Sequence, residues 1–509
     1  MAQAFTLTFF CSDYIVSPRA EKAEFPRGLR LAQPLNTIVL ELQTGLADMS
    51  PDTSERFDVV IVGGRCAGSP LATFLKRAGL SVCVCDQAEF PSDTLSTHMF
   101  QLSGIEVLQK LGVMDAVLAS GAPPLTNCYM KFEDVDLSGP ARLRKNDPRL
   151  AMLCVRRISL DVHLVEKARE VGVDLRLHTR VTELVKKNGR VAGVRVADRN
   201  GKSYTIDADL VVGADGRNSL IGRLAEARRY HVIPSERISS WAYFRGVPQD
   251  VEPKLYYHRL GDDFVVAAPT DDGLFLVCLC PSVECFDSYR SDSERWFTRA
   301  VEGCPPVAQL LANAERVTKF RGLTRFEGFF REATGPGWVL VGDAGHFKDP
   351  TPGQGISDAL RQVEMLSAAI VQGFGNPKVR DAALRGWWRW RDKDALQHYW
   401  FCSDIGKRGT ISPVRLEMLR RVARDEELRK DFLDIFIHRK YPRQVFGPST
   451  LMSATARKLM DRSNRPGVIR DALQLMSEDI DRRIQAWLPR FTHTAAIDEP
   501  HLDYQPTAA

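Results

Sequence analysis

The sequence predicts an α/β fold with an added helical module: a Rossmann-like parallel sheet, a separate antiparallel sheet and a set of C-terminal helices. Two observations predict the parallel sheet. A βαβ pattern begins at Phe57, and two later buried strands end in Asp-Gly or Gly-Asp motifs. A third observation, the change to helical periodicity after Phe374, predicts the helical module.

Composition excludes several classes of protein. The chain has 509 residues, of which 44% are hydrophobic and 26% charged, as in globular proteins of two or three domains. The net charge of +5 is too small to indicate a nucleic-acid partner. No apolar run reaches the roughly 20 residues of a transmembrane helix, so no membrane span is expected.

The cysteines indicate the compartment. The 11 cysteines are scattered, without the spacing of a zinc site or of a disulfide framework. We therefore expect a cytoplasmic protein with no metal ion.

The chain before Met49 allows two interpretations. Residues 1–48 lack the basic start and apolar core of a signal peptide. They are either a disordered or non-native extension that precedes a start at Met49, or an N-terminal arm that packs on the body.

The first βαβ unit spans residues 57–86. The continuous apolar run at 59–62 predicts a strand buried on both faces, followed by a helix that ends near Gly79. A second buried strand ends at Asp86, at the separation from the glycine turn that a ribose-binding acid requires.

The turn between this strand and helix is typical of a dinucleotide site. Gly63 allows the sharp reversal, and Gly68 allows close packing of helix on strand, so that free N–H groups face a pyrophosphate. Arg65 replaces the middle glycine of G-x-G-x-x-G. A guanidinium can hold phosphate with two hydrogen bonds, although a plain βαβ turn remains an alternative.

Two later segments have the same strand-to-loop character. Residues 207–225 form a buried strand that ends in Asp215-Gly216 and is followed by a helix. Residues 337–366 form a strand that ends in Gly342-Asp343, a proline-rich loop, and a helix that opens at Gly353 or Gly355. We call the glycine motifs of these segments, at 63–68, 215–216 and 342–343, the first, second and third fingerprints. All three segments bring strand ends to one rim of the sheet.

In this order, the three segments resemble those of the p-hydroxybenzoate-hydroxylase-like flavoproteins, which include aromatic hydroxylases, flavin halogenases and geranylgeranyl reductases. The resemblance spans residues 57–374 and implies FAD as the cofactor. It implies an FAD-binding domain at 49–229 and 329–374, and a substrate-binding β-sheet domain at 230–328. A helical C-terminal module at 375–495 and a tail at 496–509 would follow.

The resemblance also implies which residues hold FAD. Arg157 would lie near the phosphates, Asp86 on the adenosine ribose, Val181 at the adenine and Asp343 on the ribityl side. Ser357 stands where the family has asparagine in P-x-x-G-x-G-x-N, so no contact of this position with the flavin is predicted. The full set is Gly63, Gly64, Arg65, Ala67, Gly68, Asp86, Arg157, Val181, Asp215, Gly216, Gly342, Asp343, Pro350, Gly353, Gly355 and Ile356.

The activity that the resemblance implies is monooxygenation. In this family reduced flavin and O2 form a C4a-hydroperoxide, which would hydroxylate or epoxidise a small aromatic or polyketide-like metabolite, with NAD(P)H as reductant. The sequence has no second glycine fingerprint for NAD(P)H, so a separate flavin reductase is also a possible partner. A geranylgeranyl-reductase-type enzyme and, less commonly, a flavin-dependent binding protein are the alternatives.

Flavin halogenation is a further alternative. Halogenases carry a W-x-W-x-I-P motif in the middle of the chain. Here Trp388 and Trp390 are followed by Arg391 and Asp392, beyond the third fingerprint. We interpret these tryptophans as helix packing.

Three residues are candidates for catalysis, and for His98 a capping or supporting role is the alternative. His98 lies in a segment expected near the flavin and could donate to it or to a substrate oxygen. His346 and Lys348 follow the third fingerprint. The C-terminal helices would either close over the substrate or form a homodimer contact.

Overall fold

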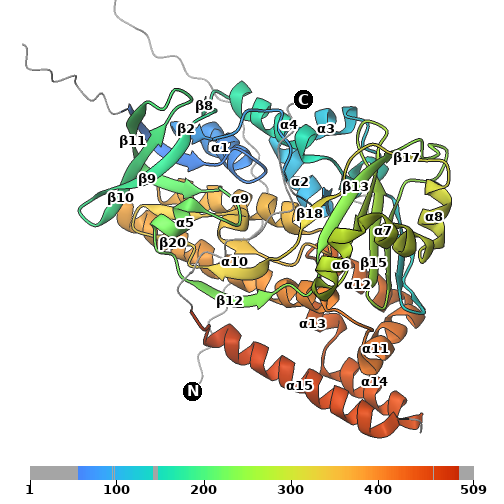
Figure 1. Ribbon diagram of the computed structural model, residues 1–509. Coiled ribbons are helices and arrows are strands. Elements are labelled where there is room, and N and C mark those ends of the chain that lie inside the picture. Colours follow the sequence, from blue (N-terminus) through green and yellow to red (C-terminus); the bar gives the residue numbers. More distant parts are fainter. Residues whose placement is uncertain (1–54, 95, 97, 142–146, 462–463, 492–509) are drawn as a thin grey trace, which may run out of the picture. The chain divides into compact units, whose positions relative to one another are not determined.

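The computed structural model describes residues 55–94, 96, 98–141, 147–461 and 464–491 (Figure 1). All of the described residues belong to one compact unit. The extension predicted at 1–48 and the tail predicted at 496–509 lie outside the described residues.

The predicted parallel sheet is present and has eight strands. β1 and β11 form its centre, and the pairs β21–β11, β11–β1, β1–β2 and β2–β8 are all parallel. A hairpin of two strands extends antiparallel from β11. The strands are β20 (Thr334–Gly335), β21 (Trp338–Leu340), β11 (Ser203–Gly213), β1 (Glu55–Val62), β2 (Val82–Cys85), β8 (Asp174–Arg176), β10 (Arg190–Ala197) and β9 (Arg180–Lys187).

Both faces of the sheet are covered, as the apolar run in β1 predicts. Val59 and Ile61 pack in the core formed with the helices of one face, whereas Val60 and Val62 pack with the β9–β10 hairpin and α5. The helices of the first face lie far apart in the sequence: α1 follows β1, whereas α9 and α10 come after residue 354. The helices of the two faces are α1 (Gly68–Arg77), α9 (Gly355–Gln372), α10 (Pro377–Gly406) and α5 (Leu220–Leu224).

A second, mostly antiparallel sheet of nine strands forms the predicted substrate region. It also takes in β4, β5 and β6, which come from within the predicted FAD segment 49–229, because β4 pairs in parallel with β14. The strands are β17 (Glu315–Arg316), β13 (Ser239–Arg245), β16 (Phe275–Leu279), β15 (Asp263–Pro269), β14 (Lys254–Leu260), β4 (Asn127–Phe132), β5 (Val135–Asp136), β18 (Arg321–Leu323) and β6 (Gly139–Pro140).

The two faces of this sheet meet different helices. Ala242 and Val277 face the core made with α7 and α8, whereas Trp241 and Tyr243 face the core made with α10 to α12. The C-terminal module therefore packs on the inner face of the substrate sheet. The helices of the outer face are α6 (Phe286–Ser291), α7 (Ser293–Glu302) and α8 (Pro305–Leu311).

Short elements connect the two sheets. β3 (Met99–Phe100) pairs with β7 (Leu153–Cys154), and a three-stranded sheet contains β12 (Arg229–Pro234), β19 (Glu327–Arg331) and β22 (His346–Phe347). The helices of this region are α2 (Leu102–Leu111), α3 (Met114–Ala119) and α4 (Arg157–Glu170).

The predicted helical C-terminal region is confirmed, and Trp388 and Trp390 of α10 pack against the core of the parallel sheet. Its helices after α10 are α11 (Pro413–Arg424), α12 (Glu426–Phe436), α13 (Pro442–Val445), α14 (Pro448–Met460) and α15 (Arg465–Trp487). Within the described part of the chain, no helix has the length and apolar character needed to cross a membrane.

Candidate functional site

The glycine turn after β1 is closed by backbone contacts. A Cβ atom at Gly68 would lie 1.7 Å from the carbonyl oxygen of Gly63, and one at Gly63 would lie 2.5 Å from that of Ala214. Gly63 also has a φ of +100°. Only glycine fits these positions, and the first turn lies directly against the second fingerprint.

Asp86 lies at the end of β2, beside this turn. Its carboxylate accepts hydrogen bonds from the backbone N–H groups of Gly64, at 2.6 Å, and Ala88, at 2.8 Å. The backbone N–H of Thr179 donates to the carbonyl of Asp86 at 2.9 Å, which brings the start of β9 next to it. Val181 buries its side chain in the core there, so its expected contact with adenine would use the backbone.

Two arginines converge on one buried carboxylate near the turn. Arg65 Nη1 and Arg157 Nη2 each lie 2.9 Å from Oδ2 of Asp161, whose side chain is fully buried. Burial disfavours the charged guanidinium, but Asp161 outweighs it and raises the pKa of Arg157. Two guanidinium groups share one carboxylate, so one positive charge remains to attract a phosphate.

Asp215 of the second fingerprint accepts hydrogen bonds from residues at the start of α5. The carboxylate of Asp215 accepts from the hydroxyl of Ser219 at 2.6 Å and from the backbone N–H of Ile221 at 3.1 Å. Burial raises the pKa of Asp215. Gly216 takes a φ of +74°, which completes the turn. A contact of either residue with FAD stays a prediction.

The third fingerprint touches the first. Gly342 has a φ of +62°, and a Cβ atom there would lie 3.1 Å from the Cβ of Ala67. Asp343 is half-buried, and none of the residues in the described ranges donates a hydrogen bond to its carboxylate. Burial raises its pKa to about 6, against the lowering effect of Arg157.

The residues present fit FAD. The glycine turns of the three fingerprints pack directly on one another and form one cradle, a positive charge lies beside it, and Asp343 offers an acceptor. Gly355 begins α9, whose N-terminus would present N–H groups to the flavin end. When bound, FAD supplies the redox chemistry at this rim.

The proline-rich loop before α9 packs against β3. Gly353 has a φ of +65°, and a Cβ there would lie 3.1 Å from the Cβ of Met99. Ser357, at the position of the family's asparagine, accepts a hydrogen bond from the backbone N–H of Gln101 at 2.8 Å. Ile356 is buried in the core beneath. The serine therefore anchors the helix start to the β3 segment.

Lys348 lies in a buried polar network behind this loop. Its Nζ lies 2.6 Å from Oδ2 of Asp358 and donates to Oε1 of Gln354 at 2.8 Å. His438 Nε2 lies 2.8 Å from Oδ1 of the same aspartate. Gln354 in turn donates to the backbone carbonyls of Ile435 and Phe436. The network thus fastens the loop to the C-terminal module.

His346 is buried away from the loop. Its ring lies 4.5 Å from that of Phe330, and its Nδ1 is 3.3 Å from Nε2 of Gln362. Burial lowers its pKa well below the usual value. Neither His346 nor Lys348 lines the cavity described next, and their catalytic roles stay predictions.

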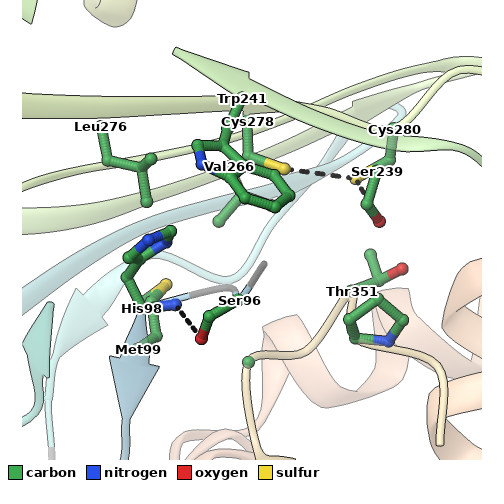
Figure 2. A pocket seen from close by; sticks show the side chains of 12 residues that line it. Ser96, His98, Met99, Ser239, Trp241, Val266, Leu276, Cys278, Cys280 and Thr351 are labelled. Atoms are coloured by element: carbon green, nitrogen blue, oxygen red, sulfur yellow. Dashed lines mark hydrogen bonds between the residues drawn. The ribbon is translucent and has the colours of Figure 1, made fainter. Parts of the chain in front are cut away.

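An apolar cavity lies between the proline-rich loop and the inner face of the substrate sheet (Figure 2). Its open space is about 20 Å³, which holds a single water molecule. Most of its lining is apolar. The lining residues are Ser96, His98, Met99, Ser239, Trp241, Val266, Leu276, Cys278, Cys280, Pro350, Thr351 and Gly353.

His98 is the predicted catalytic residue that this cavity contains. Its Nε2 lies 2.6 Å from the hydroxyl of Tyr243, and its ring packs edge-on to Trp241 at 5.5 Å. Nδ1 is buried with no partner in the part of the chain that the structure describes. Burial lowers the pKa of His98 to about 3, so the ring is neutral. Its φ of +62° directs the side chain toward the sheet.

Several residues of the site escaped sequence analysis. Trp241 and Tyr243 alternate along β13, and this period of two could have placed both on one face. Asp161 follows Arg157 by four residues on α4, an ion-pair spacing that was visible in the sequence. Nothing local connects Asp358 to His438, because that pairing depends on tertiary packing.

Comparison with known proteins agrees with the FAD site described above. The FAD binding domain family matches residues 56–377. A 1H-pyrrole-2-carbonyl-[peptidyl-carrier protein] brominase of Pseudoalteromonas luteoviolacea is 26% identical over 363 residues, covering 68% of this chain and 86% of that protein. A digeranylgeranylglycerophospholipid reductase of Thermoplasma acidophilum is 24% identical over 321 residues, covering 60% and 76%.

Solved structures share the fold. The flavin-dependent brominase Bmp2 superposes with a TM-score of 0.64 at 19% identity, covering 81% of this chain and all of that one. The p-nitrophenol 4-monooxygenase PnpA of Pseudomonas putida DLL-E4 superposes with a TM-score of 0.62 at 18% identity, covering 76% and 100%. The family match spans more than half of the sequence and coincides with the glycine cradle. The chain therefore belongs to the FAD-binding domain family and is an FAD-dependent oxidoreductase.

Proposed function

We propose that the protein is a monooxygenase that uses reduced FAD and O2 to hydroxylate or epoxidise a small aromatic metabolite. The observation that carries this proposal is the apolar cavity where the proline-rich loop, His98 and the inner face of the substrate sheet meet. Oxygen transfer requires a site that excludes bulk water and orients the substrate. The mostly apolar lining would exclude bulk water, and His98 would orient a substrate.

The His98–Tyr243 pair supplies the polar group that such a cavity needs. The pKa of Tyr243 is well above its ordinary value because the residue is buried, so the hydroxyl keeps its proton. When that hydroxyl donates to Nε2 of His98, the ring proton lies on Nδ1. Nδ1 then donates to a substrate oxygen, for example that of a phenol or carbonyl, and this hydrogen bond fixes the orientation of the substrate ring.

The cavity has to widen for a substrate. Its present 20 Å³ is far below the few hundred Å³ of a small-molecule site. Thr351 and Gly353, on the proline-rich loop, form the wall opposite the sheet, and the glycine is held at a left-handed conformation there. Movement of this loop is the change that would admit a ring against Trp241.

Halogenation is the second candidate, and the relatives favour it. Proteins named as a pyrrole-carrier-protein brominase, a corresponding chlorinase and a tryptophan 2-halogenase are among the similar sequences. Against it, Trp388 and Trp390 belong to α10, where the indole N–H of Trp388 donates to the hydroxyl of Tyr230 at 2.7 Å. They pack the helix and do not form the halogenase W-x-W-x-I-P motif.

One experiment separates the candidates. Protein loaded with FAD is reduced by NADH, NADPH or a separate flavin reductase, and then mixed with O2 and a panel of phenols, indoles and pyrroles, with and without bromide. Products that gain one oxygen atom in both conditions support the proposal. Bromide-dependent replacement of hydrogen by bromine would assign a halogenase. Anaerobic addition of two hydrogens to a polyprenyl substrate would assign a reductase.

A further inference from the structure

The outward face of α15 carries a continuous apolar stripe. Its side chains are between 49% and 87% exposed. We call this set the α15 stripe. It comprises Ile469, Leu473, Met476, Ile480 and Trp487.

The inward face of the same helix is held by charges. Arg482 makes two hydrogen bonds to Asp404 on α10, at 2.7 and 2.8 Å. Glu478 accepts from Lys407 at 3.0 Å and from Arg415 at 2.6 Å. Val468 is also buried on this face, against α11 and α14, and Ala472 is buried beside it, so α15 is apolar on its outward face as well as at part of its inward face. The ion pairs therefore fix the stripe toward solvent, next to α14 at the lower edge of Figure 1.

The spacing of the stripe indicates a helical partner. The residues follow one another at intervals of four, three, four and seven, which are the a and d positions of a heptad repeat. Such a seam suits one helix packed lengthwise on another. Arg483 stands at the one seam position that is not apolar.

The size of the stripe suits a stable interface. With Ile484 and Leu488, which are 51% and 72% exposed, seven large apolar side chains are available. Each offers on the order of 100 Å² or more, so together they present roughly 800 Å², the area per partner in a standard interface. Monomers rarely expose an apolar patch of that size.

The charges beside the stripe argue against a membrane surface. Helices that lie in membranes are flanked by lysine and arginine, whereas Arg470 and Arg483 are here accompanied by Asp479. Apart from Arg483, the seam positions from Ile469 to Trp487 carry no charged side chain, and few charges at the core are typical of permanent homodimers. We propose that two copies of this chain pair through the α15 stripe, helix against helix, in a two-fold symmetric dimer. This does not depend on which reaction the enzyme catalyses.

Sedimentation of the full-length, FAD-loaded protein tests the proposal. At micromolar concentration we expect a mass of twice the 57.1 kDa chain. The Leu473→Glu and Ile480→Glu variants should be monomers, with at least about 100-fold weaker association, because the dimer would bury unpaired carboxylates. Their FAD content and far-ultraviolet circular dichroism should stay unchanged, since both positions are exposed.

The control is Val379→Glu, which replaces another exposed apolar residue, on α10, and should leave the dimer intact. A wild-type monomer would overturn the proposal. So would a dimer that survives both stripe substitutions. If the monomer binds vesicles of phosphatidylcholine and phosphatidylglycerol and the stripe variants do not, the stripe is a membrane contact and the proposal is also wrong.

Discussion

Replacing Lys348 by methionine is expected to destabilise the protein strongly. The Lys348 and Asp358 side chains are only 3% and 5% exposed, and their charged atoms lie 2.6 Å apart. Methionine keeps the length of the side chain but removes the charge, which leaves Asp358 buried with His438 as its remaining partner. Breaking a buried pair in this way costs about 3–5 kcal/mol of unfolding free energy.

The pH dependence of this cost has a defined sign. Burial raises the pKa of Asp358, but Lys348 and His438 outweigh it and hold that pKa well below its usual value. In the wild type the stabilisation from the ionised carboxylate is therefore constant above pH ~4 and is lost only at lower pH. In Lys348→Met the pKa of Asp358 rises, so the deficit relative to wild type shrinks as the pH falls from ~8 to ~5.

Urea unfolding of both proteins across this pH range measures the deficit, and the double variant Lys348→Met/Asp358→Asn should recover most of it. Lys110→Met is the matched control, because its partner Glu364 and the lysine are both partly exposed. That change should cost less than about 1 kcal/mol. A deficit below 1 kcal/mol for Lys348→Met, or one that does not change with pH, would refute the reasoning.

Three further results are expected. Gly68→Ala should abolish FAD binding, because the new Cβ would lie 1.7 Å from the carbonyl oxygen of Gly63. Gly64→Ala should retain flavin absorbance, because its Cβ would lie 3.4 Å from the nearest atom, in the side chain of Asp86. His98→Asn, which tolerates the positive φ, and Tyr243→Phe should each lower product formation by roughly 10²-fold at unchanged FAD content, and equal turnover would remove the pair from the reaction. The raised pKa of Asp343, about 6, means that the FAD-free protein loses stability as the pH rises from ~4 to ~6. Asp343→Asn should remove that part of the pH dependence of Tm, and an identical profile would contradict it.

The parallel sheet and its cofactor rim could be predicted because their signals are local. The run at 59–62, the positive φ of Gly63 and the acid at Asp86 all follow from the path of one βαβ unit. The boundary of the substrate sheet could not be predicted in the same way. β4 joins that sheet by pairing with β14, more than a hundred residues later in the chain, and no local pattern encodes the pairing.

In the candidate site, too, single residues could be predicted from one segment, whereas their partners from other segments could not. His98 could be selected from its segment, but its partner Tyr243, on β13, lies 145 residues away in the sequence. Arg65 was expected at a phosphate, and the structure gives it Asp161 and Ser92 as further partners. Such networks depend on which helices meet, so charge and spacing within one segment do not reveal them.

The C-terminal helical module contacts both the proline-rich loop of the cavity and α15. α10 contributes Asp404 to the ion pairs that orient α15, and α12 contributes the carbonyls that hold Gln354 of the proline-rich loop. Both contacts belong to the helices that cover the inner face of the substrate sheet. The C-terminal module therefore holds the cavity wall through α12 and orients the α15 stripe through α10.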